Sequence, residues 1–211
     1  MKSLDKDLKI LFVDNHLLAV CKPKGMLTQP NQTGAPNLED LAKAWVKKEY
    51  HKKGNVFLHP IHRLDKPVSG IVLFARTSKA LSRLNAQMRE RAFIKTYLAE
   101  VEGHLPEKSG ELRHHLVHGS HHARVDPTGK LAHLSFTVVE ERPKTTVASV
   151  TLHTGRYHQI RAQFAHIGHP ILGDAKYGAT QSSPHIALHH SELTFNHPIS
   201  KEKVTLSFPL P

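Results

Sequence analysis

The chain has 211 residues, which is enough to bury one substantial hydrophobic core. Its 29 Lys and Arg against 18 Asp and Glu give a formal net charge of +11, which favours an anionic partner, and nucleic acid before a membrane surface. No apolar run approaches the roughly 20 residues that span a bilayer. The opening residues, MKSLDKDLKI, also lack the apolar segment of a secretory signal, so we expect a cytoplasmic protein without a membrane partner. The single Cys21 excludes an internal disulfide and a Cys-rich zinc site, in agreement with a reducing compartment.

The first third of the chain predicts a hairpin, a loop and a helix. Two short aliphatic segments, LKILFVD and HLLAVCK, predict a β-hairpin with Asn15 in its turn. A loop rich in Pro and Gly follows, and Asn37 then offers an N-cap for a helix. The apolar residues Leu38, Leu41 and Trp45 share one face of that helix.

The rest of the chain predicts further strands interrupted by two helices. SGIVLFAR predicts a buried strand, and Ser78 offers a cap for a helix that points Leu81, Leu84 and Met88 inward. Extended segments follow in FIKTYLAEVEG, LAHLSFTVVEE and TTVASVTLHT, then a short helix in HQIRAQFAHIG that stops at Gly168, then SELTFNHP and KVTLSFPLP. We therefore expect an α+β fold, a mixed, mainly antiparallel sheet with flanking helices and loops, as a single domain over residues 1–211.

The chain is rich in His, with 19 in all, and several fall in the segment HHLVHGSHH. Imidazole is a common metal ligand, so a metal site has to be weighed. The segment has no H-E-x-x-H spacing, and adjacent His side chains on a strand or turn point in diverging directions. We predict a polar loop that partly faces RNA, without a metal. Its members are His114, His115, His118, His121 and His122.

Three groups of residues could carry chemistry. In HPIHRLDKPVSGIVLFA, Asp65 lies in a loop between Arg63 and Lys66, just before a buried strand. Neighbouring cations favour the ionised carboxylate, which can act as a nucleophile or a base. The alternative is an ordinary turn or surface ion pair, which is what most loop Asp residues make.

The second group is carried by TGRYHQIRAQFAHIGHPILGDAKYG, where Arg156, His158 and Arg161 fall in or just before the short helix. Two Arg side chains at a helix N-terminus favour a phosphate or a carboxylate, although a basic surface helix is an equally good interpretation. The third group is Lys95 with Tyr97, two residues apart and so on one side of a strand. A cation beside an aromatic ring suits a nucleotide, whereas a Tyr in a strand is more often core packing.

Taken together, these segments closely resemble the RluA-type pseudouridine synthases. The resemblance extends from about Leu8 to Pro211 and rests on motifs in family order: KPKGMLTQP, HRLDKPVSG, FIKTYLAEVEG, GRYHQIRAQFAHIGHPILGDAKYG, LHHSELTFNHP and FPLP. The joint occurrence of all of them is highly specific. His62 before Arg63 also favours this family over the related RsuA type, whose loop usually has Gly at that place.

The resemblance implies an RNA-modifying isomerase with an RNA-binding cleft and no cofactor, which converts uridines of structured RNA, ribosomal or transfer, to pseudouridine. Asp65 matches the catalytic aspartate, which adds to the flipped uridine or assists departure of its base. Arg161 matches its ion-pair partner, and Tyr97 the aromatic that stacks on the target uracil. Arg63 matches an arginine that enters the space left by the flipped nucleotide. The residues that we expect near the RNA are Lys22, His62, Arg63, Lys95, Arg156 and His158.

The chain also departs from the family pattern. Val68 and Tyr157 stand where Thr is common, and Ala162 with Gln163 where Val and His are common. None of these removes a catalytic group. We expect no N-terminal S4 domain, so that the catalytic domain itself selects the RNA, and we expect a monomer. Two other classes are alternatives: a non-catalytic RNA-binding protein of the same fold, and a His-rich metal-dependent nuclease.

Overall fold

The computed structural model describes residues 8–209, which form two compact units. Unit 1 takes the described residues up to Phe93 and those from Ser191 onward, and unit 2 takes residues 94–190. Residues 1–7, which are most of the opening segment that lacks a secretory signal, and the last two residues of the FPLP motif lie outside the described part.

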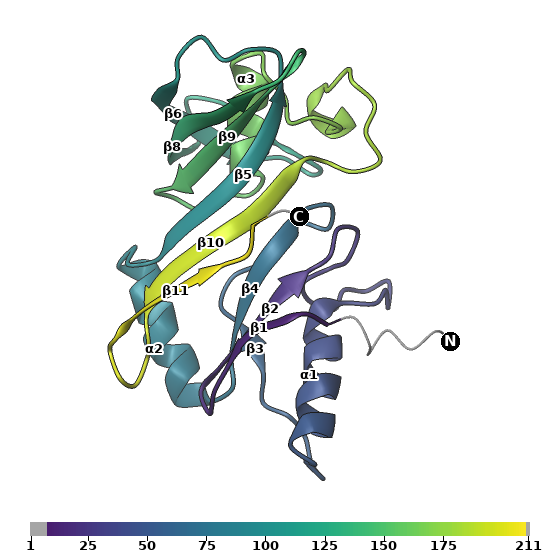
Figure 1. The fold of residues 1–211 in the computed structure, drawn as a ribbon, viewed down its shortest axis with the longest axis vertical. Coiled ribbons are helices and arrows are strands. Elements are labelled where there is room, and N and C mark those ends of the chain that lie inside the picture. Colours follow the sequence, from purple (N-terminus) through teal and green to yellow (C-terminus); the bar gives the residue numbers. More distant parts are fainter. Residues whose placement is uncertain (1–7, 210–211) are drawn as a thin grey trace. The chain divides into compact units, whose positions relative to one another are not determined.

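Unit 1 is a sheet with two helices (Figure 1). Its strands follow the order β1-β2-β4-β10, with β3 beside β4 and β11 beside β10, and the pairings β1/β2, β2/β4, β3/β4 and β10/β11 are antiparallel. β10 begins in unit 2, because unit 1 resumes only at Ser191. The elements are β1 (Ile10–Val13), β2 (Leu17–Lys22), α1 (Leu38–Glu49), β3 (His59–Pro60), β4 (Ser69–Ala75), α2 (Ser78–Arg89), β10 (Leu188–Asn196) and β11 (Lys203–Ser207).

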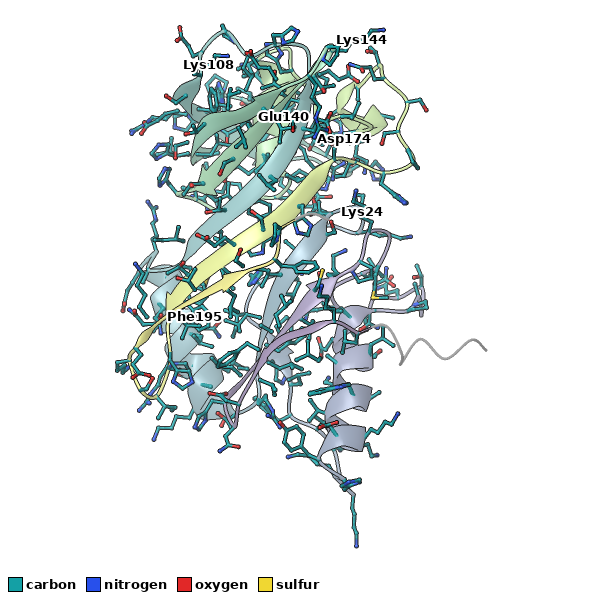
Figure 2. The ribbon with its side chains drawn as sticks, in the orientation of Figure 1. Lys24, Lys108, Glu140, Lys144, Asp174 and Phe195 are labelled. Carbon is teal, nitrogen blue, oxygen red and sulfur yellow. The ribbon has the colours of Figure 1, made fainter. Side chains whose placement is uncertain are left out.

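The core of unit 1 is formed largely by the aliphatic segments from which strands were predicted. Every residue of β4 is buried, as expected for a strand that has neighbours on both sides. Phe195 of β10, labelled in Figure 2, stacks on Phe93 with ring centroids 5.5 Å apart. The predicted hairpin, the strand before α2 and both helices are confirmed.

The two helix starts of unit 1 show one confirmed cap and one correction. The side chain of Asn37 accepts a hydrogen bond from the backbone N–H of Asp40 at 3.0 Å, as predicted. The cap of α2 is Thr77, whose Oγ1 accepts from the backbone N–H of Ala80 at 3.1 Å, and not Ser78. Thr77 has the extended backbone of an N-cap, whereas Ser78 is already the first helical residue.

Unit 2 is an antiparallel sheet with one helix against it. Its strands follow the order β5-β9-β8-β6-β7, and every neighbouring pair is antiparallel. Ala162 of the helix packs among Leu116, Ala123 and Ala132 of three strands. The elements are β5 (Ile94–Glu102), β6 (Ser109–His118), β7 (Ala123–Val125), β8 (Lys130–Glu141), β9 (Thr145–Leu152), α3 (Gln159–His166) and the 3₁₀ turn η2 (Ala175–Tyr177).

The segment HHLVHGSHH, expected to be a polar loop, is largely strand. Residues 114–118 belong to β6 and pair with both β8 and β7, and only the part from Gly119 to His122 forms the turn. The reason is alternation: exposed His115 and buried Leu116 are neighbours in the strand and so point to opposite faces of the sheet. The strand could not be recognised from its few apolar residues.

Candidate active site

The loop of Asp65 lies between β3 and β4 and is held through its backbone. Buried Thr28 and Leu64 bond reciprocally: the Thr28 Oγ1 donates to the Leu64 carbonyl at 2.9 Å and accepts from the Leu64 N–H at 3.1 Å. On the other side of Asp65, the Lys66 carbonyl accepts from the N–H of Gly25 at 2.9 Å. Asp65 itself is half-buried. Its carboxylate is therefore carried by a backbone that is fixed on both sides.

Lys22 is a buried cation beneath this loop. Its side chain has no exposed surface, and its Nζ donates to the carbonyls of Pro23 at 3.0 Å, Met26 at 2.7 Å and Lys66 at 3.1 Å. Burial lowers the pKa of Lys22 to about 8, and the negative charge of Asp65 partly opposes that shift. All three acceptors are main-chain groups, so this geometry argues against the predicted direct contact of Lys22 with RNA.

The two other predicted residues of this loop differ in exposure. Arg63 is exposed, as a residue that enters a base stack has to be. His62 is half-buried, and its Nε2 accepts a hydrogen bond from the backbone N–H of Leu73 at 3.3 Å. That bond fixes the ring against β4, which suits support of the loop better than a mobile RNA contact.

In unit 2, Tyr97 and Lys95 lie on β5. Tyr97 is 7% exposed, and its ring stacks on that of buried His190 with centroids 4.6 Å apart and planes inclined by 22°. One ring face is therefore covered by the protein, and stacking on a uracil would use the opposite face. Burial lowers the pKa of Lys95. A Cβ added at Gly155 would lie 3.3 Å from the Lys95 Nζ, so the amine lies against the turn after β9.

Arg161, the third residue of α3, is 4% exposed and binds a carboxylate of unit 2. Its Nε donates to the Asp174 Oδ2 at 2.6 Å and its Nη2 to the Asp174 Oδ1 at 2.8 Å. Asp174, labelled in Figure 2, is 1% exposed and precedes η2. The sequence favoured a phosphate or carboxylate site here, and a carboxylate of the chain itself occupies part of it.

The residues before α3 are held as firmly. His158 is 8% exposed, with its Nε2 3.0 Å from the Arg161 Nη1 and its Nδ1 2.9 Å from the Tyr177 hydroxyl. Burial, with the positive charge of Arg161 next in size, lowers the pKa of His158 to about 3. Arg156 is half-buried and donates from Nε to the Leu131 carbonyl at 2.9 Å. His158 is thus an uncharged interior group, which argues against its predicted RNA contact.

Comparison with known proteins settles the family. The model of the RNA pseudouridylate synthase family matches residues 16–166, which hold the Asp65 loop, Tyr97 and Arg161. The chain belongs to this family. As an RNA pseudouridine synthase it is an isomerase that converts uridine in RNA to pseudouridine.

Relatives of this pseudouridine synthase match over nearly its whole length. The dual-specificity RNA pseudouridine synthase RluA of Haemophilus influenzae is 38% identical over 212 residues, which cover 97% of this chain and 94% of the relative. The uncharacterized RNA pseudouridine synthase YhcT of Bacillus subtilis is 34% identical over 213 residues, with coverages of 97% and 69%. A solved structure of human RNA pseudouridylate synthase domain containing 4 superposes with a TM-score of 0.83 at 22% identity and covers 99% of this chain and 91% of that one, which confirms the fold.

Sequence reasoning gave no role to three groups that this pseudouridine synthase places against the predicted residues. Asp174 and Tyr177 contact Arg161 and His158, and His190 covers a face of Tyr97. Their signal was present, since all three fall within motifs of the resemblance, GDAKYG and LHHSELTFNHP. Among residues 8–209, no group of three or more His, Cys, Asp and Glu side chains could hold a metal ion. No helix within the same range is long and apolar enough to cross a membrane.

Proposed function

We propose that Asp65 is the nucleophile of the uridine-to-pseudouridine reaction. The reaction breaks the bond between uracil N1 and ribose C1′ and forms one between C5 and C1′. N1 gains a proton, and the hydrogen of C5 leaves as a proton. The proposal is carried by the loop geometry: a half-buried carboxylate on a backbone fixed at Leu64 and Lys66, in the family motif of the catalytic aspartate.

Tyr97 and Arg161 are proposed to serve the same uridine. Tyr97 is supported as the stacking partner by His190, which covers one face of the ring and holds it in one plane. Arg161 is supported as the cationic partner of the carboxylate by its fixed guanidinium. Asp65 belongs to unit 1 and the other two to unit 2, so the resemblance alone assigns all three to one nucleotide.

The proposed substrate is structured RNA of the ribosomal or transfer class. One relative is named a dual-specificity RNA pseudouridine synthase, and another, from Nitrosomonas europaea, ribosomal large subunit pseudouridine synthase D. Exposed Arg63 is proposed to enter the space that the flipped nucleotide leaves in the base stack. Half-buried Lys95 and Arg156 are proposed as further RNA contacts. With a net charge of +11, RNA affinity is expected to fall steeply as salt is added.

A single catalytic domain, a monomeric state and a cytoplasmic location complete the proposal. The family match at residues 16–166 includes parts of both units, which supports one catalytic domain. Cys21 is half-buried and unpaired by any disulfide, in keeping with a reducing compartment. Sedimentation of the protein with and without RNA measures the oligomeric state.

The test is release of tritium from RNA labelled at uridine C5, with separate unmodified transfer and ribosomal RNA pools. Wild-type protein should release tritium from at least one pool, and Asp65→Ala should release none while it still binds that RNA. Asp126→Ala is the matched control, because Asp126 lies in the turn between β7 and β8 and its carboxylate bonds its sequence neighbours Thr128 and Arg124. Turnover by Asp65→Ala would overturn the assignment.

A further inference from the structure

The guanidinium of Arg161 is held by two side chains within unit 2. Asp174 binds the Nε and Nη2 N–H groups, and the Nε2 of His158 lies 3.0 Å from Nη1. Three of the five N–H groups of the guanidinium are thereby engaged. Because a bidentate carboxylate fixes the plane of a guanidinium, the direction of every other N–H is fixed as well.

The hydrogen bonds also determine the tautomer of His158. An arginine only donates, so the Nε2 of His158 has to be the acceptor and Nδ1 has to carry the hydrogen. Nδ1 then donates to the Tyr177 hydroxyl at 2.9 Å, and that oxygen also accepts from the backbone N–H of Ala123 at 2.8 Å. A chain of hydrogen bonds therefore connects Arg161 through His158 and Tyr177 to β7, and the Tyr177 oxygen accepts from both His158 and Ala123.

The backbone of His158 shows that the surroundings impose this position. Its φ of 51° and ψ of 26° lie in the left-handed region, which is unfavourable for a residue other than glycine. Gln159 secures the turn: its Oε1 accepts from the Thr154 hydroxyl at 2.8 Å and from the Arg156 N–H at 3.0 Å. The left-handed residue places the imidazole beside the side chain three positions later.

We propose that Asp174 and His158 are positioning residues that orient the Arg161 guanidinium for the reaction, with Tyr177 holding His158 in its turn. This inference rests on the proposed function, since it concerns how Arg161 is presented to the reacting nucleotide. It gives a role to His158 other than the RNA contact expected from the sequence. It also explains why the carboxylate of Asp174, which is 1% exposed, is buried next to α3.

The first test compares Asp174→Asn with Glu102→Gln. Both are buried carboxylates of unit 2, but Glu102 bonds Thr180 and Gln181 and not Arg161. Asp174→Asn should lower kcat for tritium release by about 100-fold with KM within about 3-fold, because a misplaced catalytic group costs that much. Glu102→Gln should keep the wild-type kcat per folded molecule. Equal kcat for the two variants, after correction for the folded fraction, would overturn the inference.

The second test does not depend on a buried ion pair. His158→Gln keeps an acceptor near the position of Nε2, and His158→Leu removes it, while both place a side chain without a branch at Cβ on the same left-handed backbone. The Gln variant should stay within about 3-fold of the wild-type kcat, and the Leu variant should fall about 10-fold or more. Equal losses of kcat, or a rise in KM alone in both variants, would contradict a positioning role. Failure of the proposed function itself has a different signature, namely turnover by Asp65→Ala.

Discussion

Both units of this pseudouridine synthase bury a cation at the candidate site, Lys22 beside Asp65 in unit 1 and the predicted catalytic Arg161 in unit 2, and the two cations are stabilised differently. Lys22 of unit 1 is surrounded by three main-chain carbonyls at 2.7–3.1 Å. Arg161 of unit 2 is neutralised by the carboxylate of Asp174 at 2.6 and 2.8 Å. Carbonyl dipoles compensate a buried charge only in part, and the pKa of Lys22 accordingly falls to about 8.

The difference matches what each cation has to hold in place. Lys22 bonds the carbonyls of Pro23, Met26 and Lys66, so it ties the loop after β2 to the backbone segment that carries Asp65. The pair of Arg161 with Asp174 fixes the orientation of a side chain. In unit 1 the predicted catalytic Asp65 is therefore positioned by hydrogen bonds to the main chain. In unit 2 the predicted catalytic Arg161 is positioned by hydrogen bonds to side chains.

The largest expected effect comes from breaking the buried ion pair. Asp174→Asn breaks the bidentate ion pair of Asp174 with buried Arg161, and loss of one partner of a buried ion pair destabilises a protein by about 3–5 kcal/mol. The measurement is the free energy of unfolding from urea titration at pH 7. Glu111→Gln serves as the control, since Glu111 pairs with Arg113 at the surface, and it should lose less than about 1 kcal/mol. A loss for Asp174→Asn as small as that of the control would mean that the carboxylate of Asp174 is not what stabilises the buried charge of Arg161.

Lys22→Met is expected to have a smaller effect. Methionine keeps most of the volume, and although three carbonyls lose their donor, the cost of burying a charge disappears with it. The net loss should be about 1–2 kcal/mol in the same urea titration. A loss larger than that of Asp174→Asn would show that the carbonyl dipoles stabilise Lys22 better than the carboxylate stabilises Arg161.

The fold was largely predictable because its strongest signals are local. The aliphatic segments of β2 and β4, and the cap at Asn37, each act over a few residues. β6 was missed because its membership of the sheet depends on pairing with β8, from Ser109↔Thr137 to Leu116↔Lys130, and not on its own composition. Local propensity does not contain that pairing.

The candidate site divides in the same way. Motif resemblance pointed to Asp65, Tyr97 and Arg161, but the surroundings of these residues depend on contacts distant in sequence. The bond from Lys22 to the Lys66 carbonyl crosses 44 positions, and no pattern around Lys22 distinguishes a buried lysine from one that faces RNA. Asp174 is 13 positions from Arg161, beyond the reach of any spacing rule within a helix.

A pH titration sharpens the comparison, because only one of the two cations can lose its proton. The pKa of Lys22 is about 8 in the folded protein and near 10.5 when unfolded, so between these values the unfolded chain binds more protons. Stability of the wild type relative to Lys22→Met should therefore rise with pH in that window, by at most about 1.4 kcal/mol per pH unit. Below pH 7 the difference should be constant. A constant difference up to pH 10 would mean that Lys22 keeps its proton, and that the carbonyls stabilise its charge fully.

Tyr177→Phe has the smallest expected effect and isolates one hydroxyl. Phenylalanine keeps the ring, whose centroid lies 5.1 Å from the Arg161 guanidinium carbon, but it removes the acceptor for the Ala123 N–H and the His158 Nδ1–H. Stability should fall by about 1 kcal/mol in urea titration. Because Asp174 still fixes the plane of Arg161, kcat should fall by only about 3-fold, less than in His158→Leu. A loss of kcat as large as that of Asp174→Asn would mean that Tyr177 and His158 orient the guanidinium. The uncharged partners of Arg161 would then matter more for its orientation than the charged Asp174.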